Sequence, residues 1–208
     1  MRYKLNWRDW NPGLDNDQQT LAEVLGSMPA AQPEAIPWLV RLLENPASPV
    51  AFPGAISLAR HDAIHALLGR GLSNQDEAFV IGFTMGAAKI IKDWQFRVFR
   101  FVSSRCYPKS YRFAVQDLIA YDLGHALGER GDAKDLHLVP FETLGGETLA
   151  ALRAAWGIDV HALQAVYRAE AAKLPHTHTS RRLDRDFGGV DPSDLYPPEG
   201  KHSDWKSE

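Results

Sequence analysis

The chain has 208 residues, of which 45% are hydrophobic, so it is long enough to bury one sizeable core, and a single domain is the expectation. A formal net charge of −3 and a pI of about 6.2 exclude a general nucleic-acid binder, because such proteins carry a basic excess. A single cysteine, Cys106, excludes an internal disulfide framework and is compatible with a reducing compartment.

Membrane-spanning and export signals are not apparent in the sequence. Residues 1–7 lack the continuous apolar core of a signal peptide. No run approaches the roughly twenty apolar residues that a spanning helix requires. These features predict a cytoplasmic protein that is either soluble or peripheral at the inner membrane face.

The first two predicted helices are short and are bounded by prolines. Apolar residues recur at helical spacing over residues 21–28, and Pro29 ends this helix. Pro37 suits the first turn of a second helix, which extends over residues 37–43 and stops at Asn45-Pro46. The proline-punctuated segment 46–54 is a connector.

A pair of histidines defines the next predicted helix. His61 and His65 are i,i+4 neighbours on one helical face, and the apolar residues Leu58 and Leu68 lie on the same face at either end. We therefore expect both imidazoles to point inward.

A second helix is predicted to start shortly after the histidines. The segment 69–74 breaks the first helix, and Ser73 followed three residues later by Asp76 resembles a capping box. Glu77 then falls in the first turn of the new helix. Two helices joined by a short loop pack antiparallel, so the carboxylate of Glu77 can return towards the histidines.

Two imidazoles and two carboxylates within seventeen residues predict a divalent-metal site made of His61, Asp62, His65 and Glu77, which are also the candidate catalytic residues. Zinc, iron(II), manganese and, with more water, magnesium suit such ligands, and two histidines with one carboxylate form a known non-haem iron pattern. The alternative is that both histidines are core residues bonded to backbone, with Asp62 and Glu77 as surface charges.

The helix that follows from Asp76 is apolar nearly all round, as expected at the centre of an α-helical domain. Gly82 and Gly86, four residues apart, would let another helix approach closely.

Residues 89–102 are predicted to form a basic amphipathic helix. Its basic side chains fall on one side and its apolar side chains on the other, namely Ile90, Ile91, Trp94, Val98, Phe101 and Val102. Such a helix can lie on an anionic membrane or receive an acidic partner, and the alternative is a solvated face over a core.

Another helix is expected from Ser110 to about residue 129. Asp122, His125 and Glu129 form a stripe on it that could add a metal ligand or an acid–base pair, or else be an ordinary structural pairing.

Two more helices precede a change in character. One helix over residues 149–156 ends at Gly157 in the position of a C-terminal cap, and Asp159 caps the next, which runs towards Pro175. From His176 to residue 208 the chain holds few aliphatic residues, which predicts an extended or disordered tail. His176 and His178 could bind metal from this tail.

The expected fold is all-α, with a single metal-binding domain of about seven helices over residues 1–175 and the tail over 176–208.

The motif His61-Asp62-x-x-His65, followed by eleven residues and Glu77, resembles the signature of the coenzyme Q biosynthesis protein four family, which takes part in making ubiquinone. A more diffuse likeness to that family's helix near the end of its domain extends over Phe141, Leu149, Leu152-Arg153 and Trp156-Gly157-Ile158. The similarity covers about residues 55–160. The family's tyrosine- and arginine-rich lead-in to the histidines is reduced here to Arg60.

The resemblance implies an all-helical fold, a divalent metal on His61, Asp62, His65 and Glu77, and a hydrophobic cavity for a prenylated substrate. Family activity is oxidative removal of the ring carboxylate of a prenylated benzoate precursor, together with the organisation of other pathway enzymes at a membrane. The implied partners are an apolar small molecule such as a prenyl lipid and a peripheral membrane contact. A homo-oligomer is compatible with this interpretation.

Three functional hypotheses follow. The first is a metal-dependent lyase or oxidoreductase that acts on an apolar aromatic carboxylate or quinone precursor, with Arg60, Lys89 and Lys92 attracting the acid group. The second is a metal-dependent phosphohydrolase, which would need Asp117 or Asp122 as a further ligand. The third is a lipid- or partner-binding scaffold without catalysis, in which the metal pins two helices together.

Overall fold

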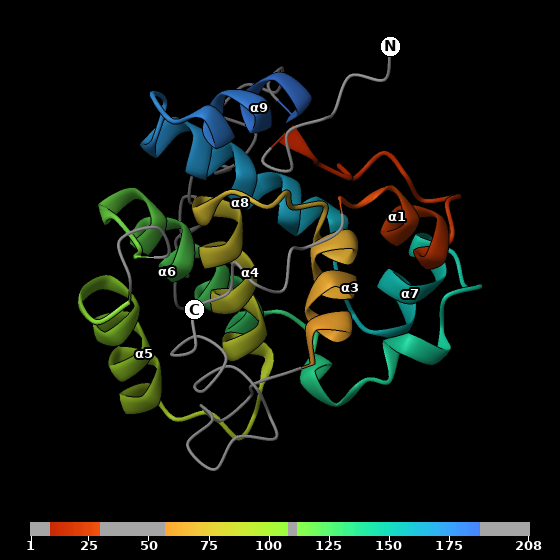
Figure 1. Ribbon diagram of the computed structural model, residues 1–208, viewed down its shortest axis with the longest axis horizontal. Coiled ribbons are helices and arrows are strands. Elements are labelled where there is room, and N and C mark those ends of the chain that lie inside the picture. Colours follow the sequence, from red (N-terminus) through yellow and green to blue (C-terminus); the bar gives the residue numbers. More distant parts are fainter. Residues whose placement is uncertain (1–8, 30–56, 108–111, 188–208) are drawn as a thin grey trace, which may run out of the picture.

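Helices form the regular structure of the described part of the chain, residues 9–29, 57–107 and 112–187, in the computed structural model (Figure 1). These residues contain no strand, only one isolated antiparallel bridge between Thr20 and Thr148. The predicted all-α fold is therefore confirmed, while the helix predicted over residues 37–43 lies outside the described residues. The elements are α1 (Leu21–Ser27), α3 (Leu58–Leu68), α4 (Asn74–Ala87), α5 (Asp93–Arg105), α6 (Val115–Arg130), the 3-10 turns η3 (Leu136–Leu138) and η4 (Phe141–Thr143), α7 (Leu149–Ala155), α8 (Val160–Lys173) and α9 (His178–Phe187).

Helices α4 and α6 pack against each other through glycines, and their backbones approach closely. A Cβ atom at Gly82 would lie 2.2 Å from the carbonyl oxygen of Tyr121, a distance that no side chain could occupy. The same obstruction by carbonyl oxygens of the opposing helix occurs at Gly86, Gly124 and Gly128. The close approach predicted from the spacing of Gly82 and Gly86 is observed, and α6 supplies the matching glycine pair.

The last turn of α3 is held from two distant helices. Gly69 ends α3 in the left-handed conformation, with φ of 66°. The guanidinium of Arg153, on α7, donates from Nε to the Leu67 carbonyl at 2.9 Å, and the hydroxyl of Tyr167, on α8, donates to the Leu68 carbonyl. These buried donors satisfy carbonyls that have no partner within the helix. They thereby fix the end of α3 that carries His65.

A buried network of charges joins the α3–α4 loop to the C-terminal helices. Arg70 is fully buried and donates from Nη1 and Nη2 to the two carboxylate oxygens of Glu170, at 3.0 and 2.9 Å. Its Nε lies 3.1 Å from Asp76 Oδ1, and Arg182 donates to the same oxygen at 2.7 Å. Asp76 also completes the predicted capping box with Ser73. The start of α4 is consequently anchored to α8 and α9.

The expectation of an extended or disordered segment from residue 176 is wrong for residues 178–187, which form α9. This helix packs against α8 (Figure 1). Its inward face is largely polar, and Thr179, Ser180, Arg182 and Leu183 are buried. The low aliphatic content of this segment did not indicate that it lacks a helix, because hydrogen bonds and ion pairs, in addition to apolar contacts, hold the helix in place. Residues 188–208 lie outside the described part of the chain.

The face of α5 that packs against the core is not the one predicted from the sequence, but the opposite one. Phe99 and Ser103 are buried, and Phe99 packs against the rings of Tyr121 and Phe113. The apolar stripe that contains Trp94 is exposed instead. The helix has two apolar faces, and its packing against α6 selected the one with Phe99.

Among the described residues, no helix has the length and apolar character needed to cross a bilayer.

Candidate metal centre

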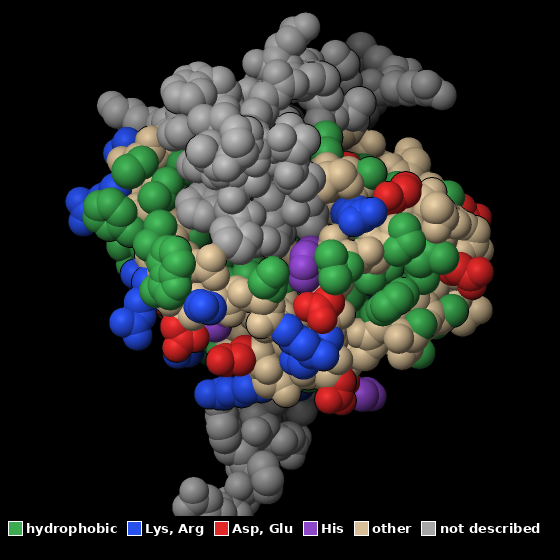
Figure 2. Space-filling view, turned by 90° about the horizontal axis from the view of Figure 1, so that it is seen from below, with side chains coloured by type: hydrophobic (Ala, Val, Ile, Leu, Met, Phe, Trp, Pro, Cys, Tyr) green, Lys and Arg blue, Asp and Glu red, His purple; other side chains and the backbone are tan. Residues whose placement is uncertain are grey.

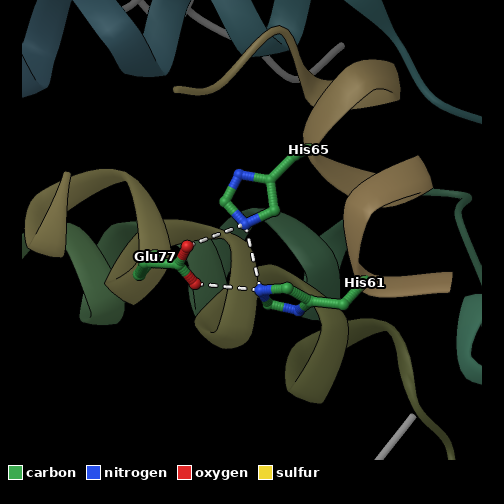
Figure 3. A group of neighbouring side chains, drawn as sticks. All are labelled: His61, His65 and Glu77. Atoms are coloured by element: carbon green, nitrogen blue, oxygen red, sulfur yellow. Dashed lines mark hydrogen bonds and ion pairs between the residues drawn. The ribbon is translucent and has the colours of Figure 1, made fainter. Parts of the chain in front are cut away.

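Three of the predicted ligands meet between α3 and α4 (Figure 3). His61 and His65 project from successive turns of α3, and Glu77 projects towards them from the first turn of α4. His61 Nε2 lies 2.9 Å from Glu77 Oε2 and 3.0 Å from His65 Nε2, and His65 Nε2 lies 3.4 Å from Glu77 Oε1. The helical spacing, the loop and the Ser73 cap thus bring together side chains that are sixteen residues apart along the chain.

The separations within this triangle suit three ligands of one cation. Ligand atoms about 2.1 Å from a common ion are roughly 3.0 Å apart at adjacent octahedral positions and roughly 3.4 Å apart in a tetrahedron. The two histidine nitrogens are 3.0 Å apart, a separation that matches this range, and they lie 2.9 and 3.4 Å from different oxygens of Glu77. One ligand atom from each of the three residues lies within 4.8 Å of the other two. Two imidazole nitrogens that face each other at 3.0 Å also require either a shared proton or a shared cation. The residues present therefore fit a divalent metal.

The site is closed on one side and accessible on the other. The side chain of His65 is fully buried, whereas those of His61 and Glu77 are 21% and 31% exposed. His65 Nδ1 is buried and has no hydrogen-bond partner within the described part of the chain, so packing rather than a second hydrogen bond orients this ring. The site therefore lies at the surface of the protein on the side of His61 and Glu77 and is not sealed within the core.

The electrostatics of the site favour an ionised Glu77. Burial by itself would raise the pKa of this carboxyl, but His65 and His61, through their charged forms and hydrogen bonds, lower it below its ordinary value. A carboxylate that stays ionised beside two imidazoles is a suitable anionic ligand for a divalent cation.

Asp62 is not part of the cluster. The three side chains whose ligand atoms lie within 4.8 Å of one another are His61, His65 and Glu77. One residue step turns a helix by about 100°, so Asp62 does not share the face of the two histidines. Burial raises the pKa of the Asp62 carboxyl, and the nearby His61 and His65 partly offset this effect. Asp62 is a half-buried carboxyl beside the three-residue group, and its part as a metal ligand stays a prediction.

The other candidate residues on α3 and α6 have different partners. Arg60 donates to the Glu142 carboxylate at 3.1 and 3.3 Å and to the His137 carbonyl, so its guanidinium is already paired. On α6, Asp122 accepts hydrogen bonds from Arg100 rather than from His125. The ring of His125 instead packs on that of Phe96 with centroids 3.8 Å apart, and burial lowers its pKa.

The remaining candidates also lie apart from the cluster. Asp117 is buried and accepts the backbone N–H of Ala114, which makes it a helix cap. Glu129, His176 and His178 are exposed, and none belongs to a metal-ligand group among the described residues. Lys89 and Lys92 are exposed near the start of α5.

The long-range contacts that support the site were not predicted from the sequence, although the capping box of Asp76 was. Arg70 and Asp76 flank the α3–α4 loop and hold the start of α4, while Arg153 caps α3. Charged residues inside apolar segments were a signal in the sequence that these residues form buried ion pairs, because a buried charge needs a partner. Their partners, such as Glu170, are about a hundred residues away in sequence.

Comparison of the chain with protein-family models, with curated proteins and with solved structures found no match.

Proposed function

We propose that the chain binds one divalent metal ion through His61, His65 and Glu77 and uses it in catalysis. The observation that carries the proposal is the convergence of the three side chains, with the histidine nitrogens 3.0 Å apart and one Glu77 oxygen within 2.9 or 3.4 Å of each. The accessible side of the site supports an enzyme over a purely structural centre, since catalytic metals keep positions for water or substrate.

A divalent cation held here would supply Lewis acidity towards a carboxylate or phenolate oxygen. The protein's own part is to keep Glu77 ionised, to hold the His65 ring rigidly in the core, and to keep His61 and Glu77 partly exposed to solvent. Asp62 lies beside the cluster as a second carboxyl that can exchange a proton. The guanidinium of Arg60 is engaged with Glu142 and the His137 carbonyl, so it is not available to attract an acidic substrate.

For the reaction, we propose oxidative decarboxylation of an apolar aromatic carboxylate, such as a prenylated hydroxybenzoate on the way to a quinone. The ring carboxyl leaves as carbon dioxide, dioxygen supplies the new ring hydroxyl, and a two-electron donor reduces its second oxygen atom to water. The support is the resemblance of the His61-Asp62-x-x-His65 and Glu77 motif to the coenzyme Q family. No observation favours a phosphohydrolase, because Asp117 and Asp122 are engaged elsewhere.

Metal binding is tested by titrating zinc, manganese and iron(II) into the chelator-treated protein, using calorimetry, with metal analysis of the protein as purified. We expect one site per chain and a loss of affinity of at least about 100-fold in His65→Asn and Glu77→Gln, since outer-shell changes alone cost 10- to 100-fold. His161→Asn is the matched control, because His161 is exposed on α8. Equal affinity of Glu77→Gln and wild type would refute the assignment.

Catalysis is tested with a hydroxybenzoate that carries a short prenyl tail, with carbon dioxide and the hydroxylated ring as readouts. Turnover that requires metal and disappears in Glu77→Gln supports the reaction. Tight metal binding without turnover, combined with a large loss of thermal stability on metal removal, would identify a structural centre instead.

A further inference from the structure

Large apolar side chains are exposed on the outward face of α5, in the turn just before it and at the start of α6. These side chains are between 41% and 74% exposed. Most of the large hydrophobic residues that are exposed within the described ranges are among them. We call this set the α5 surface, and its members are Ile90, Trp94, Val98, Phe101 and Val115. Such a cluster on one helical face indicates an interaction site rather than scattered surface hydrophobics.

Cationic side chains border the α5 surface. Figure 2 shows hydrophobic and basic side chains gathered at the left of the view, the side on which α5 lies in Figure 1. The exposed cations near it are Lys89, Lys92, Arg97, Arg105 and Arg112. Nearby carboxylates are those of Asp93, which is exposed in the first turn of α5, Asp122, which is paired with Arg100, and Asp135, which accepts the backbone N–H of Lys89. The surroundings of the α5 surface are therefore basic although the whole chain carries a net charge of −3.

A hollow of about 490 Å³ lies at the C-terminal half of the α5 surface. Arginine side chains and apolar side chains line it together, which suits a group that is both anionic and joined to hydrocarbon. Its lining residues are Arg97, Arg100, Phe101, Ser104, Arg105, Phe113, Ala114, Val115 and Leu118.

We propose that the α5 surface docks the protein on a membrane that contains anionic lipids. Trp94 and the other apolar side chains would enter the interface between headgroups and acyl chains, where tryptophan is favoured, while the bordering lysines and arginines contact lipid phosphates. The hollow would hold one anionic headgroup beside Phe101 and Val115.

Two other occupants fit the observations less well. A second copy of the chain would bring one basic surface against another, and like charges oppose that contact. An acidic peptide in the hollow would leave Ile90, Trp94 and Val98 in water, because none of them lines it. A bilayer surface covers both the hollow and the protruding side chains at once.

The test is co-sedimentation of the full chain with phosphatidylcholine vesicles, prepared with and without phosphatidylserine. We expect binding only to the vesicles with phosphatidylserine, and a decrease in binding as salt is added. The double variant Arg97→Glu/Arg105→Glu should lower the partition coefficient by at least roughly 30-fold, since each cation near an anionic bilayer contributes about fivefold. Trp94→Ser/Phe101→Ser should lower it by at least roughly tenfold.

Matched controls separate docking from general surface effects. Leu138→Ser removes a comparably exposed hydrophobic residue on η3, and Arg181→Glu reverses an exposed charge on α9, so neither should change vesicle binding. Circular dichroism and thermal melting check that each variant remains folded. Absence of binding to phosphatidylserine vesicles would overturn the proposal, as would equal binding by Trp94→Ser/Phe101→Ser and wild type. A dimer in light scattering that this variant dissociates, or preferential binding of an acidic peptide, would assign the surface to those partners instead.

Discussion

Replacing the buried Arg70 by Met is expected to destabilise the protein strongly. The guanidinium packs against the rings of Phe79 and Tyr167, at 4.4 and 4.9 Å from their centroids, and pairs with Glu170 and Asp76. Burial alone would lower the pKa of Arg70, but Glu170 and Asp76 raise it, which shows how strongly these carboxylates favour the cation. Methionine fills a similar apolar space but leaves Glu170 without its cationic partner.

Removal of one partner from a fully buried ion pair costs about 3 to 5 kcal/mol. The loss corresponds to a decrease in Tm of roughly 6 to 20 °C, because a domain of this size loses about 2 to 4 °C per kcal/mol. Urea unfolding followed by circular dichroism measures the difference in the free energy of unfolding.

The double variant Arg70→Met/Glu170→Gln shows whether the loss of stability in Arg70→Met comes from the unpaired carboxylate of Glu170 or from lost packing around residue 70. If the buried carboxylate causes the loss, neutralising Glu170 should restore about 1 to 2 kcal/mol relative to Arg70→Met. Arg185→Met, at a side chain that is 77% exposed, should change stability by less than about 0.5 kcal/mol. A loss below about 1 kcal/mol for Arg70→Met, or a double variant that is less stable than the single one, would refute the reasoning.

Three further predictions concern helix packing, pH and metal. Gly82→Ala should destabilise the protein by about 1 to 3 kcal/mol in urea unfolding, because the new Cβ would lie 2.2 Å from the Tyr121 carbonyl oxygen. Gly26→Ala in α1 meets nothing within 4 Å and should be stabilising or neutral, so equal losses would contradict the packing argument. Burial lowers the pKa of His125, so the unfolded state binds more protons, and stability should fall as pH decreases through about 6.5. His125→Phe should reduce that pH dependence, and unchanged dependence would assign it to other groups. Finally, a metal at about 100 times its Kd should raise Tm by roughly 5 to 10 °C, an effect that a chelator reverses and that Glu77→Gln lacks.

Local features of the sequence predicted the described helices other than α9, and three members of the candidate site. The i,i+4 spacing of His61 and His65, the capping box of Ser73 and the short loop all depend on neighbouring residues. These rules place Glu77 beside the histidines without reference to the rest of the chain. The spacing of Gly82 and Gly86 likewise predicted a close helix contact, although not that α6 would make it.

Long-range packing decided the features that the sequence left open. Helix α5 has two apolar faces, and only its contact with Tyr121 of α6 determined that Phe99 is buried and Trp94 exposed. Helix α9 buries polar side chains such as Arg182 because Asp76, 106 residues earlier, is there to pair with it. Hydrophobic periodicity shows which faces of a helix are apolar, and composition shows which segments are polar. Neither indicates which distant partner will satisfy a buried charge, because that depends on the arrangement of helices in three dimensions.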